Sequence, residues 1–108
     1  ADDPELCRRL ALSYRDVRRY GPRRIAGALR RRLFPDALVE EIVREVSRPD
    51  DELAAAAAAL RKRFRDGVPP GREGAAKAYR FLSGRGFSPD ACRRAIRGTS
   101  FHIEEGEV

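Results

Sequence analysis

At 108 residues the chain fits one compact unit or two very small ones, which argues against a large single core. Hydrophobic residues make up 42% of the chain and aromatic residues only 7%, so packing depends mainly on Leu, Ile, Val and Ala. The net charge of +6, from 23 Lys and Arg against 17 Asp and Glu, favours acidic partners. No apolar run approaches the ~18 residues needed to span a bilayer, so no membrane association is expected.

The residue types that catalysis and metal binding need are scarce and scattered. Cys7 and Cys92 stand alone and His102 is the single histidine, so neither a zinc site nor a disulfide framework is indicated. No nucleophile has a neighbouring base. The stretch Gly71-Arg72-Glu73-Gly74 lacks a Walker lysine and a βαβ context. We therefore expect no enzyme activity, metal, cofactor or small-molecule substrate, and the unpaired cysteines favour a cytoplasmic location.

Proline divides the chain into helical segments. Five of the seven prolines precede segments with helical periodicity, where a fixed φ and a missing N–H are tolerated: Pro4, Pro22, Pro35, Pro49 and Pro89. Pro69 and Pro70 instead lie between two glycines, in a stretch that breaks a helix and opens a loop. This pattern predicts an all-α fold of six helices.

The first half of the chain predicts three short helices. The first, over about residues 4–19, has an apolar stripe on a 3.6-residue period, at Leu6, Leu10, Tyr14 and Val17. The second, over about residues 22–32, is expected to turn three residues inward, Ile25, Ala28 and Leu29. The third begins at Pro35 and is acidic because it contains Glu40, Glu41 and Glu45. Such short helices need a shared core.

The second half repeats this design. A fourth helix, over about residues 50–66, has an apolar stripe at Leu53, Ala57, Leu60 and Phe64. A fifth, over about residues 72–85, offers Ala75, Ala78, Tyr79 and Leu82. The sixth begins at Pro89-Asp90-Ala91, which matches Pro35-Asp36-Ala37 at an offset of 54 residues, a spacing in the range of helical repeats. Cys92 then falls on an apolar position and is interpreted as a core residue.

These elements predict two tandem three-helix bundle repeats in an elongated, curved arrangement. The first repeat is expected over residues 1–48 and the second over residues 49–100. The remaining residues, 101–108, contain three Glu and are expected to form an acidic, disordered tail.

Arginine is concentrated in two places. Ten Arg lie between Arg8 and Arg32 with one acid, Asp16, and a second basic group ends the fourth helix. Helical spacing predicts that Arg8, Arg15 and Arg19 project away from the apolar stripe. The alternatives are a solvated helix face, a helix-dipole role for the second group, and a genome of high G+C content that enriches Arg; the scarcity of acids favours binding in the first group. The candidate binding residues are Arg8, Arg15, Arg18, Arg19, Arg23, Arg24, Arg30, Arg31, Arg61, Lys62, Arg63 and Arg65.

Two sets of motifs resemble a known family. The segment Arg19-Tyr20-Gly21-Pro22-Arg23-Arg24-Ile25, followed by Ala28-Leu29-Arg30, resembles the middle repeat of the bacterial RecX regulatory proteins. The family's last repeat is similar to three later segments, Tyr79-Arg80-Phe81-Leu82, Arg85-Gly86-Phe87-Ser88 and Arg93-Arg94-Ala95-Ile96. Family members usually have three repeats, and the first is expected to be absent here, so the chain resembles a fragment or a natural short form.

The resemblance implies a cytoplasmic modulator that docks in the helical groove of the RecA recombinase filament on single-stranded DNA. Such a protein would bridge protomers and suppress strand exchange, and it would contact DNA directly through phosphate neutralisation. Two other hypotheses stay open. The chain is a stand-alone DNA-binding module, since three-helix units resemble helix-turn-helix folds, or it is an adaptor for an acidic protein.

Overall fold

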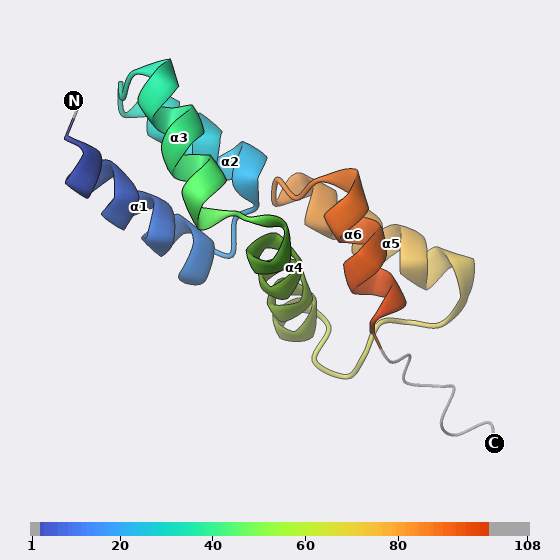
Figure 1. Cartoon of the computed structure of the whole chain (residues 1–108). Helices are drawn as coiled ribbons and strands as arrows, with labels where there is room; N and C mark the ends of the chain where they lie inside the picture. Colours follow the sequence, from blue (N-terminus) through green and yellow to red (C-terminus); the bar gives the residue numbers. More distant parts are fainter. Residues whose placement is uncertain (1–2, 100–108) are drawn as a thin grey trace.

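The computed structural model describes residues 3–99, and within that range it contains six α-helices and no β-strand (Figure 1). The helices are α1 (Pro4–Asp16), α2 (Pro22–Arg31), α3 (Asp36–Val46), α4 (Pro49–Arg63), α5 (Gly71–Gly84) and α6 (Pro89–Arg97). They are arranged as two successive groups of three along an elongated molecule. The all-α prediction is confirmed. The tail predicted over residues 101–108 and His102 lie outside the described residues.

The helices begin where the sequence supplies a suitable first turn. Proline opens α1, α2, α4 and α6, at positions whose N–H has no partner within the helix. Two of these starts also have a side-chain cap. The Asp3 carboxylate accepts from the backbone N–H of Glu5 at 3.0 Å, and the Ser88 hydroxyl accepts from that of Ala91 at 3.2 Å.

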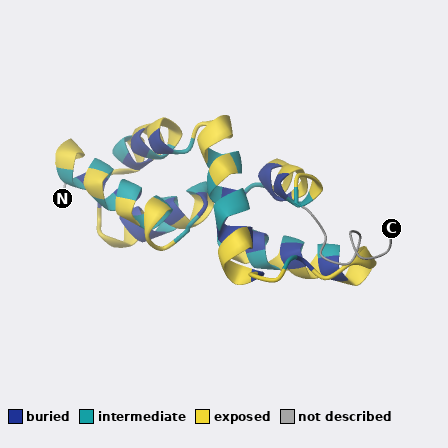
Figure 2. Cartoon of the chain, turned by 90° about the horizontal axis from the view of Figure 1, so that it is seen from below, coloured by how far each residue is buried: buried dark blue, intermediate teal, exposed yellow. Residues whose placement is uncertain are grey.

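Each group of three helices encloses its own core. Residues of α1, α2 and α3 form one cluster, and residues of α4, α5 and α6 form another. The stronger helix–helix contacts all lie within a group. Figure 2 shows the same division, with buried faces turned toward neighbouring helices and exposed faces turned outward. The first core is built mainly from Ile, Leu, Val and Phe, whereas the second contains five Ala and therefore depends more on close helix packing.

The predicted inward face of the first helix was wrong by about one residue. Cys7 and Ala11 are fully buried, whereas Leu6 and Leu10 are only half-buried at the edge of the core. The small side chains of Cys7 and Ala11 allow α1 to approach its neighbours closely, so they lie where the helices touch, and the larger leucines lie on either side of them. The helix also ends at Asp16, earlier than predicted, and this leaves Val17 with 69% of its surface exposed.

The internal repeat has a spacing of 53 residues, not the 54 that the Pro-Asp-Ala triplets suggested. Buried residues correspond at this spacing in five pairs: Ile25 and Ala78, Leu29 and Leu82, Phe34 and Phe87, Val39 and Cys92, and Ile42 and Ala95. The backbone agrees, because Leu33 and Gly86 correspond and both have a positive φ, 69° and 96°. The triplets are one residue out of register because the residue before α3 is Pro35, whereas the residue before α6 is Ser88.

The two repeats meet through direct backbone contacts. The N–H of Gly21 donates to the carbonyl of Arg85 at 2.7 Å, and the N–H of Arg23 donates to the carbonyl of Gly86 at 3.1 Å. A Cβ on Gly21 would lie 2.5 Å from the carbonyl carbon of Gly86, so both glycines are needed for this close approach. The start of α2 is therefore fixed against the turn that follows α5.

Candidate functional site

A groove lies at the junction of the two repeats. Its lining residues come from the α1–α2 connection and from α4, α5 and the turn after α5, namely Val17, Arg18, Arg19, Tyr20, Ala59, Lys62, Arg63, Phe81 and Arg85. We call it the inter-repeat groove; its volume is about 450 Å³. Among the described residues that line it, five are cations and none is acidic. Cations gathered between walls of low polarity make the electrostatic potential in the groove more positive, and this attracts an anionic ligand.

Aromatic rings hold several of these cations in place. The guanidinium carbon of Arg85 lies 5.6 Å from the ring centre of Tyr20 and 5.8 Å from that of Phe81. Arg63 lies 4.7 Å from the ring of Phe64 and 6.0 Å from that of Phe81. These are cation–π distances, and they order long side chains that would otherwise lose entropy on binding. The groove is therefore partly preorganised for a ligand.

Two guanidinium groups of the groove retain hydrogen-bonding capacity. The Nε atoms of Arg19 and Arg85 are covered by protein atoms and make no hydrogen bond to any residue between positions 3 and 99. Arg19 also has a positive φ of 61°, an uncommon conformation for a residue with a side chain. Arg85 donates through Nη2 to the carbonyl of Arg18, which ties the groove's two sides together. An oxyanion seated in the groove would be attracted by the charge of these guanidinium groups, since their Nε atoms are covered.

Two of the predicted binding residues are engaged within the first repeat by acidic partners. Arg8 binds Glu45 of α3 with two hydrogen bonds, from Nε at 2.5 Å and from Nη2 at 3.2 Å. Hydrogen bonding between the two raises the pKa of Arg8 and lowers the pKa of Glu45. Arg30 pairs with Asp36 at 3.3 Å. These pairs fasten α1 to α3 and α2 to the start of α3.

Helical spacing predicted that Arg15 projects into solvent, but in the structure its side chain is held against the protein. Its side chain is 24% exposed, its Nε lies 2.8 Å from Asp16, and its Nη1 donates to the carbonyl of Val46 at 2.9 Å. The hydrogen bond between Arg15 and Asp16 lowers the pKa of Asp16 and raises that of Arg15. Arg15 therefore satisfies a carbonyl at the end of α3, where that helix has unpaired acceptors.

The remaining predicted residues fall at three places. Arg23 and Arg24 donate to carbonyls of the second repeat, those of Phe87 at 3.5 Å and Gly84 at 3.2 Å. Arg31 is exposed near the end of α2. Arg61 and Arg65 line a different hollow, described below. The structure thus brings Arg18, Arg19, Lys62 and Arg63 together in one groove, and the guanidinium of Arg24 lies 4.4 Å from the ring centre of Tyr20 beside them.

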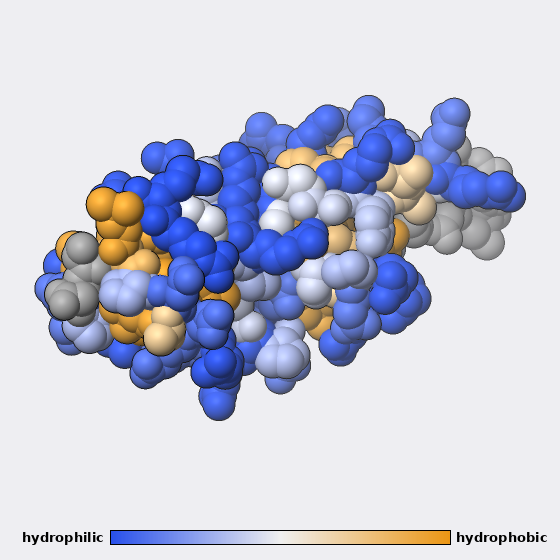
Figure 3. Space-filling model, turned by 90° about the horizontal axis from the view of Figure 1, so that it is seen from above, coloured by the Kyte–Doolittle hydropathy of each residue, from blue (hydrophilic) through white to orange (hydrophobic). Residues whose placement is uncertain are grey.

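Sequence reasoning missed five participants in the inter-repeat groove: Val17, Tyr20, Ala59, Phe81 and Arg85. None belongs to a run of basic residues, and they come together only because the two repeats pack at the Gly21–Gly86 contact. Figure 3 shows one face of the molecule, where hydrophilic side chains dominate and smaller apolar patches appear between them. A linear count of charge does not reveal which cations share a hollow with aromatic rings.

Fold and groove together define a class: a helical-repeat protein with a cationic groove between repeats. Residues 50–96 match the family model described as RecX, third three-helix domain. The chain is similar to proteins named "Regulatory protein RecX" from two organisms. It is 37% identical over 86 residues to that of Halorhodospira halophila, covering 80% of this chain and 52% of the relative. It is 40% identical over 91 residues to the protein of Thermus thermophilus, and the matched region covers 84% of this chain and 54% of the relative.

The chain belongs to the RecX family of regulatory proteins. It spans about half the length of the curated relatives that it matches. No solved structure matches it significantly. In the described part of the chain, none of the helices has the length and apolar character that crossing a membrane requires. Residues 3–99 also contain no cluster of three or more potential metal ligands.

Proposed function

We propose that this chain regulates RecA by docking in the groove of the RecA–single-stranded DNA filament through its inter-repeat groove, and that it inhibits recombination without catalysing a reaction. The observation that carries this proposal is the five-cation, acid-free groove at the junction of two tandem repeats. A filament presents regularly spaced subunits and a polyanion. An elongated array of repeats suits such a target because separate weak contacts add through effective concentration.

The charge distribution of the first repeat supports the same assignment. Arg8, Arg15 and Arg30 are occupied by acidic or carbonyl partners, so they maintain the fold. The groove cations instead share one hollow, where their mutual repulsion costs stability unless an anionic ligand compensates it. The proposed setting is the cytoplasm, where RecA acts and where unpaired cysteines stay reduced.

Binding to three targets at matched salt tests the proposal. The targets are preformed RecA–single-stranded DNA filament, free RecA and free single-stranded DNA, and ATP hydrolysis by the filament is followed in parallel. We expect the filament to bind most tightly and its ATP hydrolysis to fall. Equal affinity for filament and free RecA would contradict docking in the filament groove.

A second candidate is a stand-alone DNA-binding module. The observation that favours it is the combination of groove cations with the rings of Tyr20 and Phe81, since phosphates pair with cations and bases stack on aromatic rings. Such a module would bind single-stranded DNA tightly without RecA. The logarithm of its association constant would fall linearly with the logarithm of the salt concentration, with a slope of about −0.7 for each phosphate neutralised. Weak binding to DNA alone at moderate salt would exclude it.

A further inference from the structure

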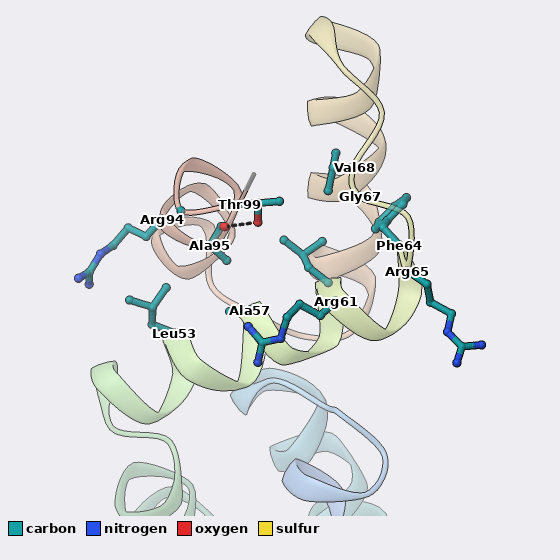
Figure 4. A pocket seen from close by; sticks show the side chains of 12 residues that line it. Leu53, Ala57, Arg61, Phe64, Arg65, Gly67, Val68, Arg94, Ala95 and Thr99 are labelled. Atoms are coloured by element: carbon teal, nitrogen blue, oxygen red, sulfur yellow. Dashed lines mark hydrogen bonds between the residues drawn. The ribbon is translucent and has the colours of Figure 1, made fainter. Parts of the chain in front are cut away.

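A second hollow lies between α4 and α6, apart from the inter-repeat groove (Figure 4). Its volume is about 560 Å³. We call it the α4–α6 groove. Its floor is apolar, formed by Leu53, Ala57, Leu60, Phe64, Val68 and Ala95. Leu53 and Ala57 are partly exposed, whereas the other floor residues are at most 9% exposed, so the hollow lies at the edge of the second repeat's core.

Cations surround this apolar floor. Arg61 and Arg65 come from α4 and the residues that follow it, and Arg94 comes from α6. In Figure 4 the Arg94 and Arg65 side chains leave the hollow in opposite directions, and Arg61 lies between them. No acidic residue is among those that line the hollow within residues 3–99. The acid partner of Arg94 is Asp90, at 3.8 Å and one helical turn away. The hollow therefore suits a segment with apolar anchors and negative charge.

We propose that residues Ser100–Val108 of this chain dock in the α4–α6 groove. The segment follows directly from Thr99, which itself lines the groove and donates through its hydroxyl to the carbonyl of Ala95 at 2.8 Å. Nine residues reach as far as ~30 Å when extended, so the segment can bring its side chains back over the groove that begins at Thr99.

The chemistry of the segment matches that of the groove. Phe101 and Ile103 supply two large apolar side chains for the apolar floor, where their burial would stabilise the docked state by removing apolar surface from water. Glu104, Glu105 and Glu107 supply three negative charges for the three arginines of the rim. Both the charge and the hydrophobicity of this short segment therefore complement the groove. A partner that matches only one of the two properties would bind less well.

Docking would make the segment an internal competitor. It would cover Arg61 and Arg65, two of the residues predicted to bind an acidic partner, while the cations of the inter-repeat groove stay accessible. An external acidic ligand would then have to displace the segment before it could reach the α4–α6 groove. This inference stands on the second repeat alone and does not depend on RecA being the partner.

Paramagnetic relaxation in the full chain tests the proposal. A nitroxide is attached through Val108→Cys, which leaves all three glutamates in place, and Cys7 and Cys92 have 0% exposure and resist labelling. Amide signals of Ala57 in α4 and Ala95 in α6, both in the floor of the groove, report the position of the label. We expect these two signals to lose most of their intensity.

A matched variant separates docking from mere attachment. Phe101→Ala with Ile103→Ala keeps the label and its tether but removes both anchors, so the intensity of Ala57 should recover. Equal broadening with and without the anchors would overturn the proposal, as would undiminished signals in the original chain. Mixing isotope-labelled chain with a separate spin-labelled chain gives the last control. Broadening in that mixture would mean that the segment binds a second copy, which also contradicts docking within one chain.

Discussion

Replacing Gly86 by alanine perturbs the contact that joins the two repeats. The residue has a φ of +96°, and a Cβ built there would lie 2.5 Å from the backbone nitrogen of Arg24 and 2.6 Å from its Cβ. Two costs follow. A left-handed backbone costs a residue with a side chain about 1–2 kcal/mol, and forcing an extra methyl group into a packed contact costs about 1–3 kcal/mol. We expect Gly86→Ala to lower the free energy of unfolding by roughly 2–5 kcal/mol.

Three other glycines separate the two costs. Gly21→Ala brings the steric overlap without a positive φ and should cost about 1–3 kcal/mol. Gly71→Ala brings only the positive φ, with no atom within 4 Å, and should cost about 1–2 kcal/mol. Gly84→Ala brings neither and should be neutral or stabilising by up to about 1 kcal/mol, because alanine is the better helix former.

Urea unfolding followed by circular dichroism measures all four variants under the same conditions. The predicted order of stability runs from Gly84→Ala, the most stable, to Gly86→Ala, the least. If Gly86→Ala were no less stable than Gly71→Ala, the close contact between α2 and the turn after α5 would not exist in solution. The walls of the inter-repeat groove would then lack the contact that aligns them.

Two further predictions concern the interior of each repeat and the ion pair between α1 and α3. Cys7 and Cys92 are fully buried, and burial raises the pKa of both thiols. Iodoacetamide should therefore modify neither thiol in the folded chain and both thiols after urea denaturation. Rapid labelling of either thiol in the folded chain would contradict the packing. The pKa of Glu45 is lowered because Arg8 hydrogen-bonds to its carboxylate. The pair therefore stabilises the folded chain fully above the ordinary glutamate pKa of about 4.3, and this stabilisation is lost as pH falls through the lower pKa that Glu45 has in the folded state. Thermal melts of Glu45→Gln should therefore show a deficit in Tm at pH 7 that vanishes in strong acid, and a deficit independent of pH would refute the pairing.

The sequence was sufficient to predict the helices because their signals are local. Proline at the first turn and aliphatic residues on a 3.6-residue period each act within one helix, and Ile25 and Leu29 are buried as expected. The inward face of α1 was harder to predict. Leu6 and Leu10 carry more hydrophobicity than Cys7 and Ala11, but how closely the helices approach decides which side chains fit the contact line.

The candidate site could be predicted only in part, because its geometry depends on how the repeats pack. Linear charge density identified Lys62 and Arg63, but it gave no reason to separate them from Arg8, whose partner Glu45 lies 37 positions away in sequence. It also missed Arg85, which stands outside the basic runs and meets the groove through contacts across the junction. Long-range pairing of this kind has no signature in a local pattern.

The most direct test of the groove as the binding surface is filament affinity after charge reversal. Arg18→Glu with Lys62→Glu reverses two exposed cations of the inter-repeat groove, and Arg9→Glu with Lys77→Glu makes the same charge change at exposed positions outside it. Contacts to charged groups are worth about 1.5–3 kcal/mol each, and about 1.4 kcal/mol corresponds to tenfold in Kd. We predict that the groove pair weakens binding to the RecA–single-stranded DNA filament by more than about tenfold while the matched pair changes it far less. Equal loss in both variants would show that net charge, rather than the inter-repeat groove, determines binding.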